Sequence, residues 1–211
     1  MVNSTHTYSP DERNSSILIN INGELIPREK ATVSVFDSGF ILGDGIWEGL
    51  RVHEGTIPFL SQHLKRLWEG AKALDLDMGI SRDALADRLF QTLIANNMRD
   101  HVHIRLMVTR GIKSTPYQDP AVTISGPTIV IIPEYKIPST AKNNGIRLLT
   151  THVRRGYPDV QDQKMNSHSK INCILACIQA AKSGVDESLM LDPHGFVSTC
   201  NSTHFFIVIK G

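Results

Sequence analysis

The sequence predicts an α/β fold in two lobes, an N-terminal α+β lobe over residues 1–137 and a C-terminal lobe over residues 138–211. Segments with the period of a strand and segments with the period of a helix follow one another along the chain, which is typical of mixed α/β proteins. The stretch EYKIPSTAKNNG (134–145) contains prolines and lysines and ends in glycine, which indicates a linker between lobes. A length of 211 residues suits one large domain or two small ones.

The first lobe opens with ILININGELIP (17–27), in which strand-forming residues flank Asn22-Gly23. Both turn residues adopt positive φ readily, so the pair predicts a tight hairpin. RVHEGTIPFL (51–60) predicts a second hairpin that turns at Glu54-Gly55. Between them, FDSGFILGDGIWEG (36–49) is rich in glycine and aromatic residues. It indicates a loop with functional potential, although glycine loops are usually only turns.

Two helices and two strands complete this lobe. Ser61 is predicted to cap a helix with the apolar positions Leu64, Leu67, Trp68, Ala71 and Leu74. Ser81 is predicted to cap a second helix with the inward positions Leu85, Leu89, Leu93 and Ile94. HVHIRLMVTRG (101–111) alternates and predicts a strand with one apolar face. TIVIIP (128–133) is continuously apolar and predicts a strand buried on both faces.

The second lobe begins with the strand IRLLTTHV (146–153) and a polar loop. A helix is predicted next, with Ile171, Ile174, Leu175 and Ile178 at helical spacing and an end at Gly184. The strands ESLMLD (187–192), FVST (196–199) and HFFIVIKG (204–211) follow, with a turn at 193–195. The last strand is strongly apolar, and such a strand needs a partner. Either it pairs with earlier strands, or the sequence is a fragment of a longer protein.

Charge and composition exclude several classes of protein. The 22 basic and 21 acidic residues give a net charge of +1, so no nucleic-acid partner is expected. No apolar run approaches the roughly 20 residues that span a bilayer, and the N-terminus lacks the apolar stretch of a secretory signal. An odd number of cysteines, Cys173, Cys177 and Cys200, favours reduced thiols and a cytoplasmic location.

Common catalytic and binding motifs are missing. His101 and His103 flank one strand position, but no further ligand lies at a persuasive spacing, so no metal site is expected. The sequence has no G-x-S-x-G element, although a Ser-His-Asp triad needs no adjacency in sequence. GDG (43–45) is not a dinucleotide fingerprint, because Glu48 stands where the third glycine would be.

Lys170 is a candidate reactive amine in MNSHSKINCILACIQAAKSG (165–184). It lies toward the start of the predicted helix, where the helix dipole is unfavourable for a cation. It shares a helix face with Ile174 and Cys177, and a partly desolvated amine has the lowered pKa that an imine-forming lysine needs. An ordinary surface lysine at a helix end is the alternative.

Several segments, in order, carry a family resemblance. They are ILININGELIP, FDSGFILGDGIWEGLRV, FLSQHLKRL, IRLMVTRG, THVRRGYPD and DESLMLDPHGFVSTCNSTHFFIVIKG. The chain resembles the fold-type IV pyridoxal-phosphate enzymes, which include branched-chain aminotransferases, D-amino acid aminotransferases, (R)-selective amine transaminases and aminodeoxychorismate lyase. The resemblance implies a barrel-like C-terminal lobe, a cofactor between the lobes and a homodimer.

The resemblance also implies roles for individual residues. Arg66 in HLKRL matches the arginine that holds the phosphate of pyridoxal 5'-phosphate, and a fork of N–H donors suits that dianion. Trp47 matches the aromatic position beside the substrate, where the family often has Tyr or Phe. Thr199 matches the position that meets the pyridine nitrogen, and Cys200 and Asn166 are further cofactor-binding candidates.

Two positions depart from the family pattern. A gapless alignment from THVRRGYPD to DESLMLD places the catalytic lysine of the family on Asn166, and an asparagine amide forms no imine. Lys170 lies four residues later, on the same face of a helix, and Lys164 lies two residues earlier. We favour Lys170. The family has a glutamate at Thr199, and a hydroxyl does not keep the ring nitrogen protonated as a carboxylate does.

The function expected from these residues is a pyridoxal-phosphate-dependent aminotransferase, which moves an amino group between an amino acid or amine and a 2-oxo acid. One alternative is a non-catalytic family member that keeps the fold and binds a ligand or partner. Another is a lyase that uses the same cofactor. In relatives the chain continues past this point and supplies further contacts to the phosphate, so the C-terminal lobe and the site are expected to be incomplete.

Overall fold

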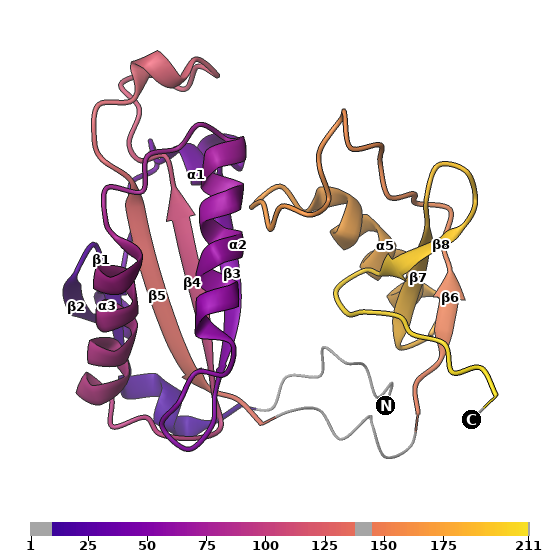
Figure 1. Cartoon of the computed structure of the whole chain (residues 1–211), viewed down its shortest axis with the longest axis horizontal. Coiled ribbons are helices and arrows are strands. Elements are labelled where there is room, and N and C mark those ends of the chain that lie inside the picture. Colours follow the sequence, from indigo (N-terminus) through magenta and orange to yellow (C-terminus); the bar gives the residue numbers. More distant parts are fainter. Residues whose placement is uncertain (1–9, 138–144, 211) are drawn as a thin grey trace. The chain divides into compact units, whose positions relative to one another are not determined.

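The computed structural model describes residues 10–137 and 145–210, which form two compact units (Figure 1). The N-terminal unit comprises residues 10–137 together with Met165–Ser169. The C-terminal unit comprises residues 145–164 and 170–210. The lobe boundary expected after residue 137 adjoins residues 138–144, which lie outside the described residues, as do residues 1–9 and 211.

A five-stranded antiparallel sheet forms the N-terminal unit, with the strand order β2-β1-β5-β4-β3. Its strands are β1 (Leu18–Ile21), β2 (Glu24–Pro27), β3 (Gly45–Val52), β4 (Val102–Thr109) and β5 (Thr128–Tyr135). The hairpin predicted at Asn22-Gly23 is confirmed, since β1 pairs with β2 and both turn residues have positive φ, 53° and 100°.

The helices are α1 (Ser38–Leu42), α2 (Leu60–Ala73) and α3 (Arg82–Ala95), with short 3₁₀ turns η1 (Glu12–Ser16), η2 (Arg28–Lys30) and η3 (Pro120–Val122). In Figure 1, α2 and α3 lie over one face of the sheet. The core between helices and sheet is apolar and includes Leu67, Leu85, Leu89, Leu50, Ile104, Leu106 and Ile131.

The predicted helix starts are half right. Ser81 caps α3, because its hydroxyl accepts a hydrogen bond from the amide of Ala84. Ser61 does not cap α2, which begins one residue earlier, after Phe59 in a left-handed conformation. The predicted cap was wrong because Ser61 lies inside α2, and the residue before the helix makes no side-chain cap hydrogen bond.

Two strand predictions for this unit need correction. The predicted hairpin at Glu54-Gly55 is only a turn with one bridge, His53 to Thr56, because β3 takes β4 as its partner. TIVIIP is not buried on both faces, since burial alternates along β5 and the side chains away from the helices are half-buried. HVHIRLMVTRG does form β4 as predicted, with Val102, Ile104, Leu106 and Val108 buried.

The C-terminal unit contains a three-stranded sheet in the order β6-β7-β8. Strand β6 (Leu148–Thr150) runs parallel to β7 (Glu187–Leu191), which pairs antiparallel with β8 (Val197–Cys200). Helix α5 (Ile171–Lys182) is present as predicted and packs against β7. The side chains that it buries are Ala176 and Ala180, whereas the predicted apolar stripe Ile171, Ile174, Leu175 and Ile178 lies exposed.

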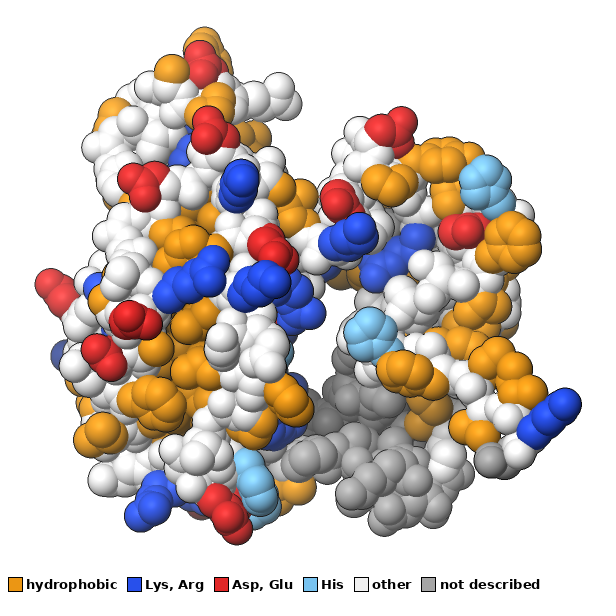
Figure 2. All heavy atoms as spheres, in the orientation of Figure 1, with side chains coloured by type: hydrophobic (Ala, Val, Ile, Leu, Met, Phe, Trp, Pro, Cys, Tyr) orange, Lys and Arg blue, Asp and Glu red, His pale blue; other side chains and the backbone are white. Residues whose placement is uncertain are grey.

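The strand predicted in HFFIVIKG is wrong. Residues 204–210 have no regular structure, and Phe206, Ile207, Val208 and Ile209 are 69–85% exposed. Apolar side chains lie exposed over the C-terminal unit (Figure 2). A strand needs backbone partners, and among the described residues this segment has none.

Replacing Leu89 by Ala tests the core of the N-terminal unit. Leu89 is fully buried on α3, so the cavity should lower the free energy of unfolding by about 2–5 kcal/mol. Ile94 on the same helix is 74% exposed, so Ile94→Ala should change it by less than about 0.5 kcal/mol. Urea unfolding measures both, and equal effects would contradict the packing described here.

Candidate functional site

A short segment from the second half of the chain, Met165–Ser169, adds to the edge of β3. The amide of Trp47 donates to the carbonyl oxygen of Asn166 at 2.8 Å, and the amide of His168 donates to that of Gly45 at 2.9 Å. The indole N–H of Trp47 donates to the carbonyl oxygen of Ser167 at 3.1 Å. These bonds satisfy part of the open edge of β3 and place Asn166 beside Trp47.

The glycine-rich loop provides the surface on which this segment lies. A Cβ on Gly45 would come within 2.9 Å of the His168 ring, and one on Gly43 within 2.7 Å of the Ser169 hydroxyl. Side chains at these positions would push the segment away from β3. The loop predicted over residues 36–49 is wrong in part, because α1 and the start of β3 form there and only Gly43 and Asp44 lie between them. The structure gives Gly43 and Gly45 a packing role.

The imidazole of His168 lies in a partly buried position against β3. Its Nε2 donates to the carbonyl oxygen of Ile46 at 3.0 Å. Burial lowers the pKa of His168, because desolvation disfavours the charged ring. The ring is therefore neutral near pH 7 and fastens the segment through one directed hydrogen bond.

Arg66 lies on α2 and forms a two-bond pair with Glu48 of β3. Arg66 Nε donates to Glu48 Oε1 at 2.7 Å, and Nη2 donates to Oε2 at 2.6 Å. Among the described residues, Nη1 of Arg66 makes no hydrogen bond. The side chain of Arg66 is 48% exposed, so these remaining donors can reach an anion in solvent.

The face of the sheet away from the helices carries a cluster of cations around Trp47. The guanidinium of Arg105 lies over the Trp47 ring, 3.8 Å from its centre. Burial lowers the pKa of Arg105, and no hydrogen bond or ion pair joins Arg105 to another described residue. A half-buried guanidinium without a carboxylate partner is a candidate anion-binding group.

His103 and Arg51 belong to the same face as Arg105. Sequence reasoning gave no role to Arg51 or Arg105 and considered His103 only as a metal ligand. Burial, with smaller contributions from Arg105, Lys136 and Arg51, lowers the pKa of His103 to about 4. The signal was available in HVHIRLMV, where His103 and Arg105 interrupt the side opposite the apolar positions of β4. The cluster is completed by Arg51 of β3, which lies opposite His103 of β4. Only the register of the two strands reveals this neighbour.

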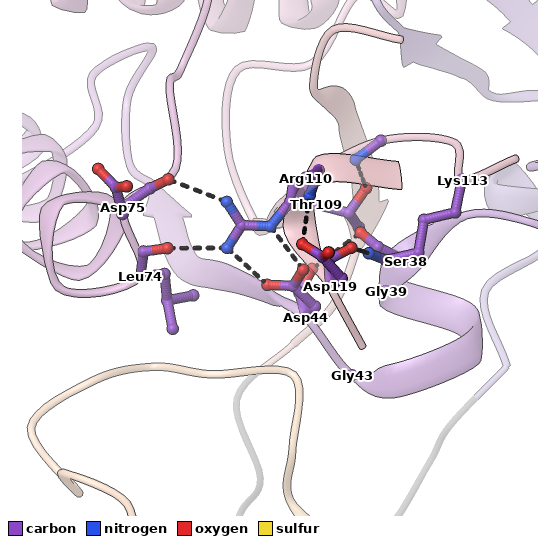
Figure 3. Close-up of polar contacts among 12 residues, drawn as sticks. Ser38, Gly39, Gly43, Asp44, Leu74, Asp75, Thr109, Arg110, Lys113 and Asp119 are labelled. Carbon is purple, nitrogen blue, oxygen red and sulfur yellow. Dashed lines mark hydrogen bonds and ion pairs between the residues drawn. The ribbon is translucent and has the colours of Figure 1, made fainter. Parts of the chain in front are cut away.

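Arg110, just after β4, ties the glycine-rich loop to the end of α2 (Figure 3). Its Nε and Nη2 donate to the carboxylate of Asp44 at 2.7 and 3.2 Å. Nη2 and Nη1 also donate to the carbonyl oxygens of Leu74 and Asp75, at 2.7 and 2.9 Å. The last carbonyl groups of a helix lack hydrogen-bond partners within it. Arg110 provides donors for two carbonyl groups at this end and also pairs with the charge of Asp44.

The two candidate lysines flank the segment that adds to β3. Lys164 precedes it and is exposed. Lys170 follows it, is half-buried, and is the residue before the first turn of α5, with no side-chain cap hydrogen bond. Asn166 lies within the segment itself and belongs to the N-terminal unit, whereas both lysines belong to the C-terminal unit.

Thr199 and Cys200 lie on β8 in the C-terminal unit. The hydroxyl of Thr199 donates to the carbonyl oxygen of Thr203 at 2.9 Å. The turn that holds Thr203 is fastened by the buried Glu187, whose Oε1 accepts from the amide and hydroxyl of Thr203 at 3.2 and 2.9 Å. Cys200 is buried, and desolvation raises the pKa of its thiol. The structure thus brings Trp47 and Asn166 together, and separately Thr199 and Cys200.

The described residues contain neither a metal-ligand cluster nor a helix that could span a membrane. No group of three or more histidine, cysteine or acidic side chains is arranged to hold a metal ion within the described ranges. In the same part of the chain, no helix has the length and apolar character needed to cross a membrane.

The family follows from a match over most of the chain. A model of the amino-transferase class IV family matches residues 45–211. The chain belongs to the class IV aminotransferase family. Class IV aminotransferases use pyridoxal 5'-phosphate, and this membership confirms the resemblance carried by the sequence motifs.

Similar proteins extend the comparison of this class IV member. Branched-chain-amino-acid aminotransferase-like protein 2 of Arabidopsis thaliana is 41% identical over 201 residues, covering 95% of this chain and 36% of that protein. A putative branched-chain-amino-acid aminotransferase of Methanocaldococcus jannaschii is 39% identical over 193 residues, covering 92% of this chain and 66% of that protein.

A solved structure confirms the fold class. The branched-chain amino acid aminotransferase of T.th., complexed with N-(5'-phosphopyridoxyl)-L-glutamate, matches with a TM-score of 0.79 at 26% identity, covering 88% of this chain and 62% of that chain. The chain spans between 36% and 66% of the length of these three proteins.

The pH dependence of stability tests the environment of His103. Its pKa of about 4 in the folded state lies below the ordinary 6.5, so the unfolded chain binds more protons between these values. The free energy of unfolding should therefore rise with pH from about 4 to about 6.5. His103→Gln, which does not titrate, should reduce this slope in urea unfolding series, with a remainder from His168. An unchanged slope would show that His103 is not desolvated.

Proposed function

We propose that this class IV member acts as a pyridoxal-phosphate-dependent aminotransferase, moving an amino group between an amino acid or amine and a 2-oxo acid. Family membership supports the reaction class, and a related structure contains a phosphopyridoxyl amino acid. Because the chain spans only part of its relatives, the activity is proposed for the whole protein. The homodimer and the cytoplasmic location expected from the sequence belong to the same proposal.

The observation that carries the proposal is the geometry of Arg66. Its Nε and Nη2 are fixed by Glu48, while the Nη1 donors of this half-exposed side chain are not bonded to any described residue. A guanidinium held in this way suits the phosphate of the cofactor. The phosphate end of pyridoxal 5'-phosphate therefore fits the residues present.

The aldehyde end does not fit Asn166, because an amide nitrogen is not a nucleophile towards an aldehyde. We propose Lys170 for that role, with Lys164 as the alternative, since both directly flank the segment that contains Asn166. Thr199 would donate to or accept from the ring nitrogen, beside Cys200. The bound cofactor supplies an electron sink for negative charge at the substrate Cα.

Substrate binding is proposed for the cation cluster around Trp47. Amino acids and 2-oxo acids both carry a carboxylate, and Arg105 is a half-buried guanidinium without an ion-pair partner among the described residues. The Trp47 ring would line the apolar part of the pocket. The lysine amine, once free, would take the proton from the substrate Cα as a general base and deliver it as a general acid to the carbon that carried the cofactor's aldehyde.

A second candidate function is a non-catalytic protein that keeps the fold and binds a ligand. Asn166 and Thr199 favour it, because these residues replace a nucleophile and a carboxylate of the family pattern. The two candidates differ in whether a lysine of this chain bonds to the cofactor.

Borohydride reduction with bound pyridoxal 5'-phosphate separates these candidates. Peptide mass spectrometry of the full-length protein should find the cofactor on Lys170, and Lys170→Ala should abolish both the adduct and transamination. Lys182→Ala, at the exposed end of the same helix, is the matched control and should change neither. An adduct on Lys164 would transfer the role to that residue. A protein that binds the cofactor without any lysine adduct would support the non-catalytic function.

A further inference from the structure

A buried carboxylate, Glu48, lies directly behind Arg66. Glu48 is on β3, on the face covered by α2, and its side chain has no exposure. Its neighbours at alternate positions, Ile46 and Leu50, are buried apolar residues. Burying a charged carboxylate costs several kcal/mol unless donors compensate it. The position therefore requires a specific set of partners.

Three donors from α2 compensate Glu48. Arg66 gives two, through Nε and Nη2, and His63 Nδ1 lies 2.8 Å from Oε2. His63 and Arg66 are three residues apart, so they share one face of the helix. The carboxylate thus holds two helix residues in fixed positions relative to β3.

This arrangement determines which way Arg66 presents its remaining donors. A free arginine side chain populates many rotamers, and a ligand that binds it must overcome the entropy of fixing one of them. With its Nε and Nη2 edge held by Glu48, the guanidinium is oriented before any ligand arrives, and the Nη1 edge is left for an anion. Preorganisation of this kind increases affinity without adding a contact.

We propose that Glu48 is a positioning residue that preorganises Arg66 for the phosphate of the cofactor. The inference rests on the proposed function of Arg66. It makes a prediction opposite in sign to a purely electrostatic account. Glu48 is negative and close to the phosphate site, so simple charge repulsion predicts tighter phosphate binding when Glu48 is neutralised. Preorganisation predicts weaker binding.

The test compares Glu48→Gln with Glu69→Gln in the full-length protein. Gln keeps the shape of the side chain, and Glu69 is an exposed carboxylate on the same helix, three residues after Arg66. Dissociation constants are measured for pyridoxal 5'-phosphate and for pyridoxal, which lacks the phosphate. We expect Glu48→Gln to weaken binding of the phosphorylated form about tenfold and that of pyridoxal less than twofold. Glu69→Gln should change neither.

Three outcomes would overturn the inference. Equal or tighter binding of pyridoxal 5'-phosphate by Glu48→Gln would favour charge repulsion. Equal weakening for both ligands would indicate general damage to the structure. A native protein that binds both ligands equally well, or neither, would remove the phosphate role of Arg66, and the proposed function would lose its main support with it.

A cofactor-free measurement tests the positioning itself. The Nε–H of Arg66 should exchange slowly with solvent in the native protein, because it donates to a buried oxygen, and at least tenfold faster in Glu48→Gln. Equal exchange rates in the two folded proteins would contradict the inference even if cofactor binding changed. Faster exchange in Glu48→Gln without a loss of phosphate affinity would show that Glu48 holds Arg66 in the native protein, but that this does not affect phosphate binding. That result would also overturn the inference and leave the proposed function standing.

Discussion

The hydrogen bonds that join Met165–Ser169 to the edge of β3 are the constraint on which the rest of the site depends. An edge strand has unpaired N–H and C=O groups, and this segment covers part of those of β3. The pairing places Asn166 beside Trp47 although 119 positions of sequence separate them. It needs glycine at positions 43 and 45, where any Cβ would collide with the segment.

This constraint shapes the chemistry on both faces of β3. Side chains alternate along a strand, so Trp47 faces the cation cluster and Glu48 faces α2 and Arg66. Arginine side chains therefore flank this strand on both sides, Arg105 on the face of Trp47 and Arg66 on the face of Glu48. The segment itself contains no lysine, so any amine that reacts with the cofactor must come from another position. Its covalent neighbours Lys164 and Lys170 are the closest in sequence.

Local patterns predicted the elements whose partners lie nearby in sequence. Asn22-Gly23 predicted its hairpin and Ser81 predicted the start of α3, because turn and cap preferences act over a few residues. HFFIVIKG has the composition of a strand, but a strand also needs a partner, which composition does not reveal. The apolar stripe of α5 indicated the helix correctly and its buried side incorrectly, because contacts with β7 are made by two alanines.

Glu48 could have been singled out, since it alone interrupts the buried positions 46, 48, 50 and 52 of β3. Its partners on α2 and the pairing of Arg51 with His103 depend on register and packing.

Hydrogen exchange at two backbone amides tests the central claim most directly. The amides of Trp47 and His168 donate across the junction between β3 and the segment, whereas other amides of β3 belong to the ladder with β4. The account predicts that both junction amides exchange at least 100-fold more slowly than exposed amides, with similar rates for the two. Rapid exchange at Trp47 and His168 while the β3–β4 ladder remains protected would show that the segment is not paired with β3, and the site described here would not form.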